Sequence, residues 1–231
     1  MNRCKRWTLA MACVCAWSAS GLTAAASHAA SASSAGGTES TEDYSSDSAR
    51  LVGEVRKRLQ SAAVVRGQFE QRKSVRGFKH PLISTGDFIV AQDAGVLWHT
   101  KAPFESRVTV TRERILTTQV DGQVTSRMDA KDEPGLRAVN EMLFAVMATD
   151  LSVLAQRFVI SGGVNGSEGW KLTLTPKDKA LVQWLLRIEL EGDRFVRTVR
   201  MQEAQGDVSV IRFTGQRAAK TLAPEDVKRF E

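Results

Sequence analysis

Apolar and polar residues alternate with a period of two along most of the chain after residue 64, and this pattern predicts β-strands. In the first such segment, Val65, Gly67, Phe69 and Gln71 alternate with charged or amide side chains. The same pattern predicts further strands over residues 86–91, 96–100, 106–116, 123–128, 170–175, 181–191, 195–203 and 208–215. Short turns such as Asp121-Gly122 join several of these segments, so consecutive strands are expected to be antiparallel.

A spacing of three or four residues between apolar positions predicts a few helices between these strands. Leu51, Val55 and Leu59 follow this spacing. Helices are predicted over residues 49–63, 134–149 and 151–158, with one helical turn at 224–231. The pattern therefore predicts a mainly β (α+β) fold. We expect a single curved antiparallel sheet that forms an incomplete β-barrel, with helices that cover its concave apolar face.

The first residues have the pattern of a secretory signal peptide. Arg3, Lys5 and Arg6 precede an uncharged apolar run over residues 7–19, and small residues follow at 24–29. The alternative is a membrane anchor, but the run is shorter than the ~20 residues that cross a bilayer. We assign residues 1–29 to the signal peptide, 30–48 to a disordered Ser/Gly-rich leader and 49–231 to one domain.

Cysteine and charge refine this picture of an exported protein. All three cysteines lie in the predicted signal, at Cys4, Cys13 and Cys15, so the processed chain has neither a disulfide nor a lipid-anchored cysteine. Removing the three basic residues of the signal lowers the net charge from +6 to +3, which gives little support for a nucleic-acid partner. We expect a soluble, unlipidated monomer in the periplasm.

Residues that carry chemistry are sparse. His80 lies beside a proline and His99 on a predicted strand, and neither has carboxylates at the spacing of a metal site. The glycines at 162, 163, 166 and 169 are interpreted as a plain loop. No nucleophile, base and orienting group can be assembled. The sequence therefore predicts no enzyme, no metal site and no cofactor.

Bulky apolar side chains on the sheet and helices are the more prominent feature, and they include Trp184. Each one can be ordinary core, and that alternative stays open. Together with flexible methionines they also suit a cavity for long alkyl chains. The residues predicted to line this apolar cavity are Phe69, Phe88, Trp98, Phe104, Leu143, Phe144, Met147 and Trp170.

The order of several short motifs resembles a known family. The motifs are Gly67-Gln-Phe69-Glu-Gln71-x-Lys73, Gly86-x-Phe88, Gly95-Val-Leu-Trp98, Pro103-Phe104, the predicted helix 134–149, Trp170-x-Leu-x-Leu-x-Pro176 and the last two predicted strands. In this order they resemble the periplasmic LolA-type outer-membrane lipoprotein carriers. The resemblance covers residues 50–230, and each motif by itself is weak.

The resemblance implies an eleven-stranded incomplete β-barrel with an α-helical lid. Such proteins carry the acyl chains of lipoproteins across the periplasm, from an inner-membrane transporter to an outer-membrane acceptor. By analogy, the helix 134–149 is a candidate gate. The chain departs from the family in having no arginine shortly before Trp98, where it reads Asp93-Ala94-Gly95-Val96-Leu97. This resembles a divergent branch that accompanies polyene-lipid or glycolipid export.

Two other functions stay open at the level of sequence. A sensor or scaffold on the same fold would bind a protein partner and regulate envelope stress. An enzyme acting on lipid or cell-wall material would need a catalytic group that the motifs do not supply. The favoured hypothesis is a carrier of a lipoprotein or another amphiphilic lipid.

Overall fold

The computed structural model describes residues 41–119, 121–129 and 151–230 of the chain. The predicted signal peptide, most of the predicted leader and the predicted helix 134–149 lie outside these residues. The residues from Thr41 onward form one compact unit.

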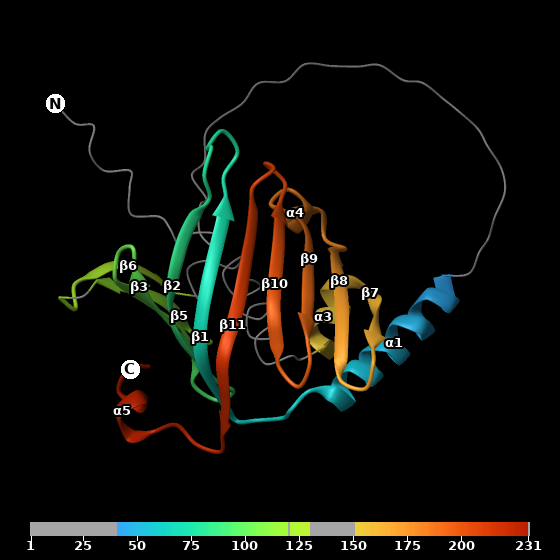
Figure 1. The fold of residues 1–231 in the computed structure, drawn as a ribbon, viewed down its shortest axis with the longest axis horizontal. Coiled ribbons are helices and arrows are strands. Elements are labelled where there is room, and N and C mark those ends of the chain that lie inside the picture. Colours follow the sequence, from blue (N-terminus) through green and yellow to red (C-terminus); the bar gives the residue numbers. More distant parts are fainter. Residues whose placement is uncertain (1–40, 120, 130–150, 231) are drawn as a thin grey trace. The chain divides into compact units, whose positions relative to one another are not determined.

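The strands of this unit form one 11-stranded antiparallel sheet, which confirms the predicted mainly β class. Figure 1 shows β1 and β11 side by side near its middle. The order is β6-β5-β4-β3-β2-β1-β11-β10-β9-β8-β7, so β6 and β7 are the two edges and the sheet is not closed into a barrel. The strands are β1 (Val64–Ser74), β2 (Leu82–Ala91), β3 (Gly95–Ala102), β4 (Ser106–Val110), β5 (Arg114–Gln119), β6 (Val124–Asp129), β7 (Phe158–Asn165), β8 (Gly169–Pro176), β9 (Leu185–Gly192), β10 (Val196–Glu203) and β11 (Val208–Ala219).

Four helices are described, namely α1 (Thr41–Arg58), α3 (Leu151–Arg157), α4 (Lys179–Val182) and α5 (Pro224–Val227). Helix α1 packs beside the edge strand β7 and contacts α3. The Ser48 hydroxyl donates to the Ile160 carbonyl at 2.8 Å, and Arg58 Nη1 donates to the Gly169 carbonyl at 2.6 Å. These bonds hold α1 at both its middle and its end.

The first helix begins earlier than its apolar spacing predicted. The sequence places its start at residue 49 and its end at residue 63, whereas α1 runs from Thr41 to Arg58. Residues 41–48 therefore belong to a helix and not to the leader to which composition assigned them. Serine, threonine and acidic residues enter the first turns of a helix readily, because their side chains satisfy its free N–H groups.

The predicted strand 106–116 is in fact a hairpin of β4 and β5. Thr111 causes the break, because its Oγ1 accepts hydrogen bonds from the backbone N–H groups of Glu113 and Arg114 at 3.2 and 3.1 Å. A threonine that binds the backbone in this way competes with the strand and closes a turn. Residues 111–114 read Thr-Arg-Glu-Arg, with no glycine or proline to mark a turn, which is why the pattern predicted a single segment.

Two further predictions about elements were wrong. The glycines interpreted as a loop include Gly162 and Gly163, which lie within β7. Gly162 has φ +142°, and a Cβ there would lie 2.1 Å from the Lys171 carbonyl oxygen, so glycine lets the two strands approach. The predicted strand 181–191 begins as helix α4 and becomes a strand only from Leu185.

The sheet has two distinct faces. Directly paired residues share a face and consecutive residues alternate. We name the face of Phe69, Phe88, Trp98 and Phe213 the aromatic face, and the opposite one the polar face. One end of the polar face is dry, because Phe230, after α5, packs in a buried cluster with Val64, Ile89, Ala91 and Leu97.

Candidate functional site

Four aromatic rings from four neighbouring strands meet at the centre of the aromatic face. Phe69 stacks on Trp98 with 3.8 Å between ring centroids and 29° between planes. Phe88 meets Phe213 edge to face at 5.0 Å, and Phe213 meets Trp98 at 6.1 Å. All four side chains are at most 6% exposed. The two edge-to-face contacts each contribute about 0.5–1.5 kcal/mol beyond the burial of area.

Two glycines make this arrangement possible. Phe69 of β1 lies directly opposite Gly86 of β2, and Gly67 of β1 lies opposite Phe88. A Cβ at Gly86 would lie 2.9 Å from the Phe69 ring, and a Cβ at Gly67 would lie 2.9 Å from the Phe88 ring. Each ring therefore crosses the neighbouring strand over a residue without a side chain. The repeated Gly-x-Phe motif of the sequence is the local cause.

Aliphatic side chains extend the aromatic face toward both edges of the sheet. On the side of β2 to β5 these are buried valines and isoleucine, namely Val90, Val96, Val108, Val110 and Ile115. On the side of β7 to β10 the buried residues are Ile160, Leu172, Leu174, Ile188, Leu190 and Val199. The result is a continuous apolar surface across the sheet, of the kind that suits alkyl chains.

Within the described residues, this apolar face also contains buried polar atoms without a hydrogen-bond partner. These atoms are Trp98 Nε1 and Ser209 Oγ. Gln71 and Thr100, both 7% exposed, lie on the same face one residue pair beyond Phe69 and Trp98. An unpaired buried donor costs free energy, so such atoms are notable where they occur. Gln71, Thr100 and Ser209 thus place polar groups beside the aromatic cluster.

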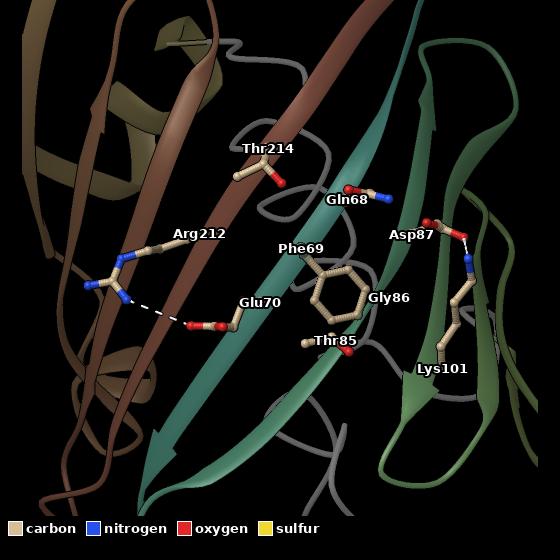
Figure 2. Close-up of a pocket in the computed structure, with 9 residues that line it drawn as sticks. All are labelled: Gln68, Phe69, Glu70, Thr85, Gly86, Asp87, Lys101, Arg212 and Thr214. Carbon is tan, nitrogen blue, oxygen red and sulfur yellow. Dashed lines mark ion pairs between the residues drawn. The ribbon is translucent and has the colours of Figure 1, made fainter.

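The polar face carries a groove of about 420 Å³ over β1, β2, β3 and β11. Figure 2 shows Glu70 facing Arg212, and Asp87 facing Lys101. Glu70 Oε1 lies 3.8 Å from Arg212 Nη1 and 2.7 Å from Arg72 Nε, and Lys101 Nζ lies 2.5 Å from Asp87 Oδ2. The hydrogen bond from Arg72 lowers the pKa of Glu70. Because its charges are paired with one another, the groove is a weaker candidate for a ligand than the aromatic face.

A second polar network holds the turn between β9 and β10. The Asp193 carboxylate accepts a hydrogen bond from Phe195 N at 3.0 Å and from Arg197 Nε at 3.0 Å, and its carbonyl accepts one from Trp170 Nε1. Burial raises the pKa of Asp193, but the hydrogen bonds from Phe195 and Arg197 outweigh it and leave the pKa below its usual 3.8. The network is structural, because every group in it has a protein partner.

The structure brings together only some of the residues predicted to line one cavity. Phe69, Phe88 and Trp98 form the aromatic cluster. Trp170 is 3% exposed on the same face, but β2, β1, β11, β10 and β9 lie between its strand and that of Trp98. Leu143, Phe144 and Met147 lie outside the described residues. That all these residues line one cavity therefore stays a prediction.

Phe104 does not belong to the buried apolar surface. It follows the end of β3 and is 76% exposed, so it does not pack with the aromatic cluster, and its predicted place in an apolar lining stays a prediction. Sequence reasoning also missed Phe213, which completes the cluster. The alternation of Ser209, Ile211 and Phe213 in the last strand could have placed it on a buried face, but only the pairing of β1 with β11 puts it beside Phe88.

Residues suited to bind a metal ion do not gather in the described ranges. No three His, Cys, Asp or Glu side chains there could hold a metal ion. His99 pairs with Glu105, with 2.8 Å between Nε2 and Oε1, and His80 is exposed. Among the described residues, no helix is long and apolar enough to cross a membrane.

The sequence matches a known protein family over most of its length. A family model described as outer membrane lipoprotein carrier protein LolA matches residues 60–229. The matched range runs from just before β1 to the residues after α5, so it includes every strand of the sheet. No curated protein matches the sequence.

Several solved structures are similar to the chain at low sequence identity. A domain from Vibrio parahaemolyticus, described as an outer membrane lipoprotein-sorting protein, is 11% identical with a TM-score of 0.44, over 78% of this chain and 95% of that one. A LolA superfamily protein from Nitrosomonas europaea is 8% identical with a TM-score of 0.43, over 78% and 96%. The complex of MucA and MucB from Pseudomonas aeruginosa is 19% identical with a TM-score of 0.41, over 80% of this chain and 60% of that one.

Proposed function

Since the chain belongs to the LolA family of outer membrane lipoprotein carrier proteins, we propose that it carries an acylated molecule on the aromatic face of its sheet. The cargo is a lipoprotein or another amphiphilic lipid. The observation that carries this proposal is the cluster of Phe69, Phe88, Trp98 and Phe213 with its aliphatic surroundings. In this proposal the protein works in the periplasm, between an inner-membrane transporter and an outer-membrane acceptor.

The physical task is to keep alkyl chains out of water. Each CH₂ group exposed to water costs about 0.8 kcal/mol, so an acyl chain cannot cross an aqueous compartment unaided. A broad apolar surface stabilises such chains without directional bonds and accepts chains of different length. Binding of this kind is reversible, which delivery requires.

The two unpaired polar atoms on the aromatic face support an acylated ligand over a plain hydrocarbon. Among the described residues, the Trp98 indole N–H has no acceptor although it is buried beside three other rings. An ester carbonyl is a hydrogen-bond acceptor attached directly to an alkyl chain. Binding of an ester would satisfy this donor while the chain covers the apolar surface.

Displacement of a fluorescent fatty acid from the purified protein tests the proposal. We expect wild-type protein to bind the probe, and Phe69→Ala to weaken binding about tenfold or more, because truncating a central anchor removes contact area. Phe104→Ala is the matched control, since this ring is exposed and away from the cluster. Equal affinity of wild type and Phe69→Ala would count against the aromatic face.

Native mass spectrometry of protein recovered from its own cell envelope identifies the cargo class. A lipid or lipoprotein adduct that is lost in Phe69→Ala supports the carrier. A stoichiometric protein partner together with an empty apolar face would instead favour the sensor or scaffold. A dialkyl ether lipid, which lacks the carbonyl, is expected to bind about tenfold more weakly than its diacyl counterpart, because one hydrogen bond is lost.

A further inference from the structure

The connection between β1 and β2 exposes apolar side chains that no described element covers. The two strands end at Ser74 and begin again at Leu82. Phe78 in the connection is 59% exposed, and Leu82 and Ile83 at the start of β2 are 49% and 45% exposed. Figure 1 shows this hairpin end at the upper end of the sheet. We call residues 72–83 the hairpin end.

Apolar residues point to both sides of the hairpin end. Leu82 pairs with Lys73 and Ile83 pairs with Arg72, so these consecutive apolar side chains lie on opposite faces. Phe78 lies beyond both strands in the turn. A partner that docks on a single flat surface would leave one side in water, whereas a medium that surrounds the hairpin end would bury all three.

The base of the hairpin end is fixed to the neighbouring hairpin of β10 and β11. Arg76 N donates to Asp207 Oδ1 at 2.9 Å, and Lys73 Nζ lies 2.9 Å from Glu203 and 3.6 Å from Asp207. Phe78 N donates to the Val75 carbonyl at 3.0 Å, which closes the turn. The apolar side chains are thus presented by an ordered support, which lowers the entropy cost of binding.

The hairpin end is also cationic. Residues 72–86 contain Arg72, Lys73, Arg76 and Lys79 and no acidic residue. The nearby carboxylates of Glu203 and Asp207 already bind Lys73 and the Arg76 backbone. Within the described part of the chain, the side chains of Arg76 and Lys79 form no ion pair, whereas Lys73 does. Exposed apolar residues set among basic ones are typical of segments that enter the interface of anionic membranes.

We propose that the hairpin end docks on a phospholipid surface that carries anionic head groups. Phe78, Leu82 and Ile83 enter the boundary between head groups and acyl chains, and Arg76 and Lys79 bind the phosphates. The inference rests on exposure and charge at this end of the sheet and not on the proposed cargo. A carrier docked in this way would hold its aromatic face close to the membrane with which it exchanges.

Vesicle co-sedimentation tests the docking surface. The full-length gene is expressed for wild type and variants alike, and mass spectrometry establishes the N-terminus of each preparation, because the apolar run 7–19 would itself bind lipid if retained. Wild type is expected to bind vesicles of equimolar phosphatidylglycerol and phosphatidylcholine far better than phosphatidylcholine alone. The double change Arg76→Gln and Lys79→Gln is expected to weaken this binding about thirtyfold, since each basic residue near the surface contributes roughly fivefold.

Matched exposed residues elsewhere supply the controls. Phe78→Ser with Ile83→Ser is expected to weaken binding about tenfold or more, whereas Val124→Ser, which is 52% exposed in wild type, is not. Arg112→Gln with Lys228→Gln removes two exposed charges away from the hairpin end. If this second pair weakens binding as much as the first, binding follows net charge and the proposal is overturned.

The fluorescence of a dye attached to the hairpin end reports directly whether this end enters the membrane. A solvent-sensitive dye on Phe78→Cys is expected to shift to the blue with anionic vesicles, and the same dye on Val124→Cys is not. An unshifted dye on a bound protein overturns insertion of the hairpin end, and capture of an acidic protein in place of vesicles would identify a protein partner instead. These variants are expected to bind the fluorescent fatty acid as tightly as wild type does. Loss of membrane docking and loss of cargo binding are therefore distinguishable.

Discussion

Phe69 stacks on Trp98 across the strand that separates them, with 3.8 Å between the ring centroids. The intervening strand contributes Gly86 at the crossing point, and its missing side chain leaves room for the Phe69 ring. The reciprocal pair, Gly67 opposite Phe88, does the same in the other direction. The centre of the aromatic face therefore depends on two glycines as much as on its four rings.

Gly86→Ala is expected to lower the free energy of unfolding by at least about 2 kcal/mol, because a rigid backbone group obstructs the new methyl. That methyl would lie 1.9 Å from the His99 carbonyl oxygen and 2.9 Å from the Phe69 ring. Gly163→Ala is the matched control in another strand, since a Cβ there has nothing within 4 Å. Urea unfolding measures both, and equal midpoints would contradict the role given to Gly86.

The two buried tryptophans Trp98 and Trp170 are expected to respond differently to replacement by phenylalanine. Trp170 Nε1 donates to the Asp193 carbonyl, whereas Trp98 Nε1 has no partner among the described residues. Both changes remove similar volume, so the hydrogen bond sets the difference. Trp170→Phe is expected to cost about 1–3 kcal/mol more than Trp98→Phe in ligand-free protein, measured by denaturant unfolding. A larger loss for Trp98→Phe would mean that its N–H has a partner.

Phe213→Ala and Phe104→Ala are expected to separate a ring of the cluster from an exposed one. Phe213 is 4% exposed and Phe104 is 76% exposed. Truncating a buried phenylalanine costs about 3–5 kcal/mol, while a surface substitution stays within about 0.5 kcal/mol. Thermal unfolding measures both changes. If Phe104→Ala is the more damaging, that ring is buried in the native protein after all.

The stability that Asp193 contributes is expected to depend on pH. Its pKa in the folded chain lies below its usual 3.8, so folding favours the ionised form. The contribution is complete at pH values above 3.8 and disappears as the pH falls through the folded pKa. Asp193→Asn is therefore expected to cost about 1 kcal/mol at neutral pH. Denaturant unfolding against pH checks this, and a constant difference between wild type and variant down to strong acid would refute it.

Much of the fold could be predicted from the sequence because strand formation has a local signature. The alternation around Phe69 and Phe88 placed both residues on strands, and the turn at Asp121-Gly122 placed a hairpin, as the structure has it. Prediction failed where a single side chain redirects the backbone. Thr111 divides the segment 106–116 into two strands, and Gly162 lies in a strand where glycine was interpreted as a loop.

The candidate site could be predicted less completely. Apolar character alone identified Phe69, Phe88 and Trp98, but it grouped them with Phe104, which is exposed, and with Trp170, which lies far along the sheet. Phe213 was missed because nothing near it in the sequence marks it as a neighbour of Phe88. The exposed hairpin end was missed for the same reason, since exposure is not a property of a sequence window.

The order of residues alone establishes the mainly β class, the family resemblance and the hairpin turn at Asp121-Gly122. These follow from interactions between residues close in the chain, where a period of two and turn-forming residues act directly. Strand order, which becomes visible in the folded chain, puts β1 between β2 and β11; this brings Phe88 to Phe213 and separates Trp98 from Trp170. Neighbours across a sheet are set by strand order and register, and these depend on the burial of the whole apolar face and not on any single segment.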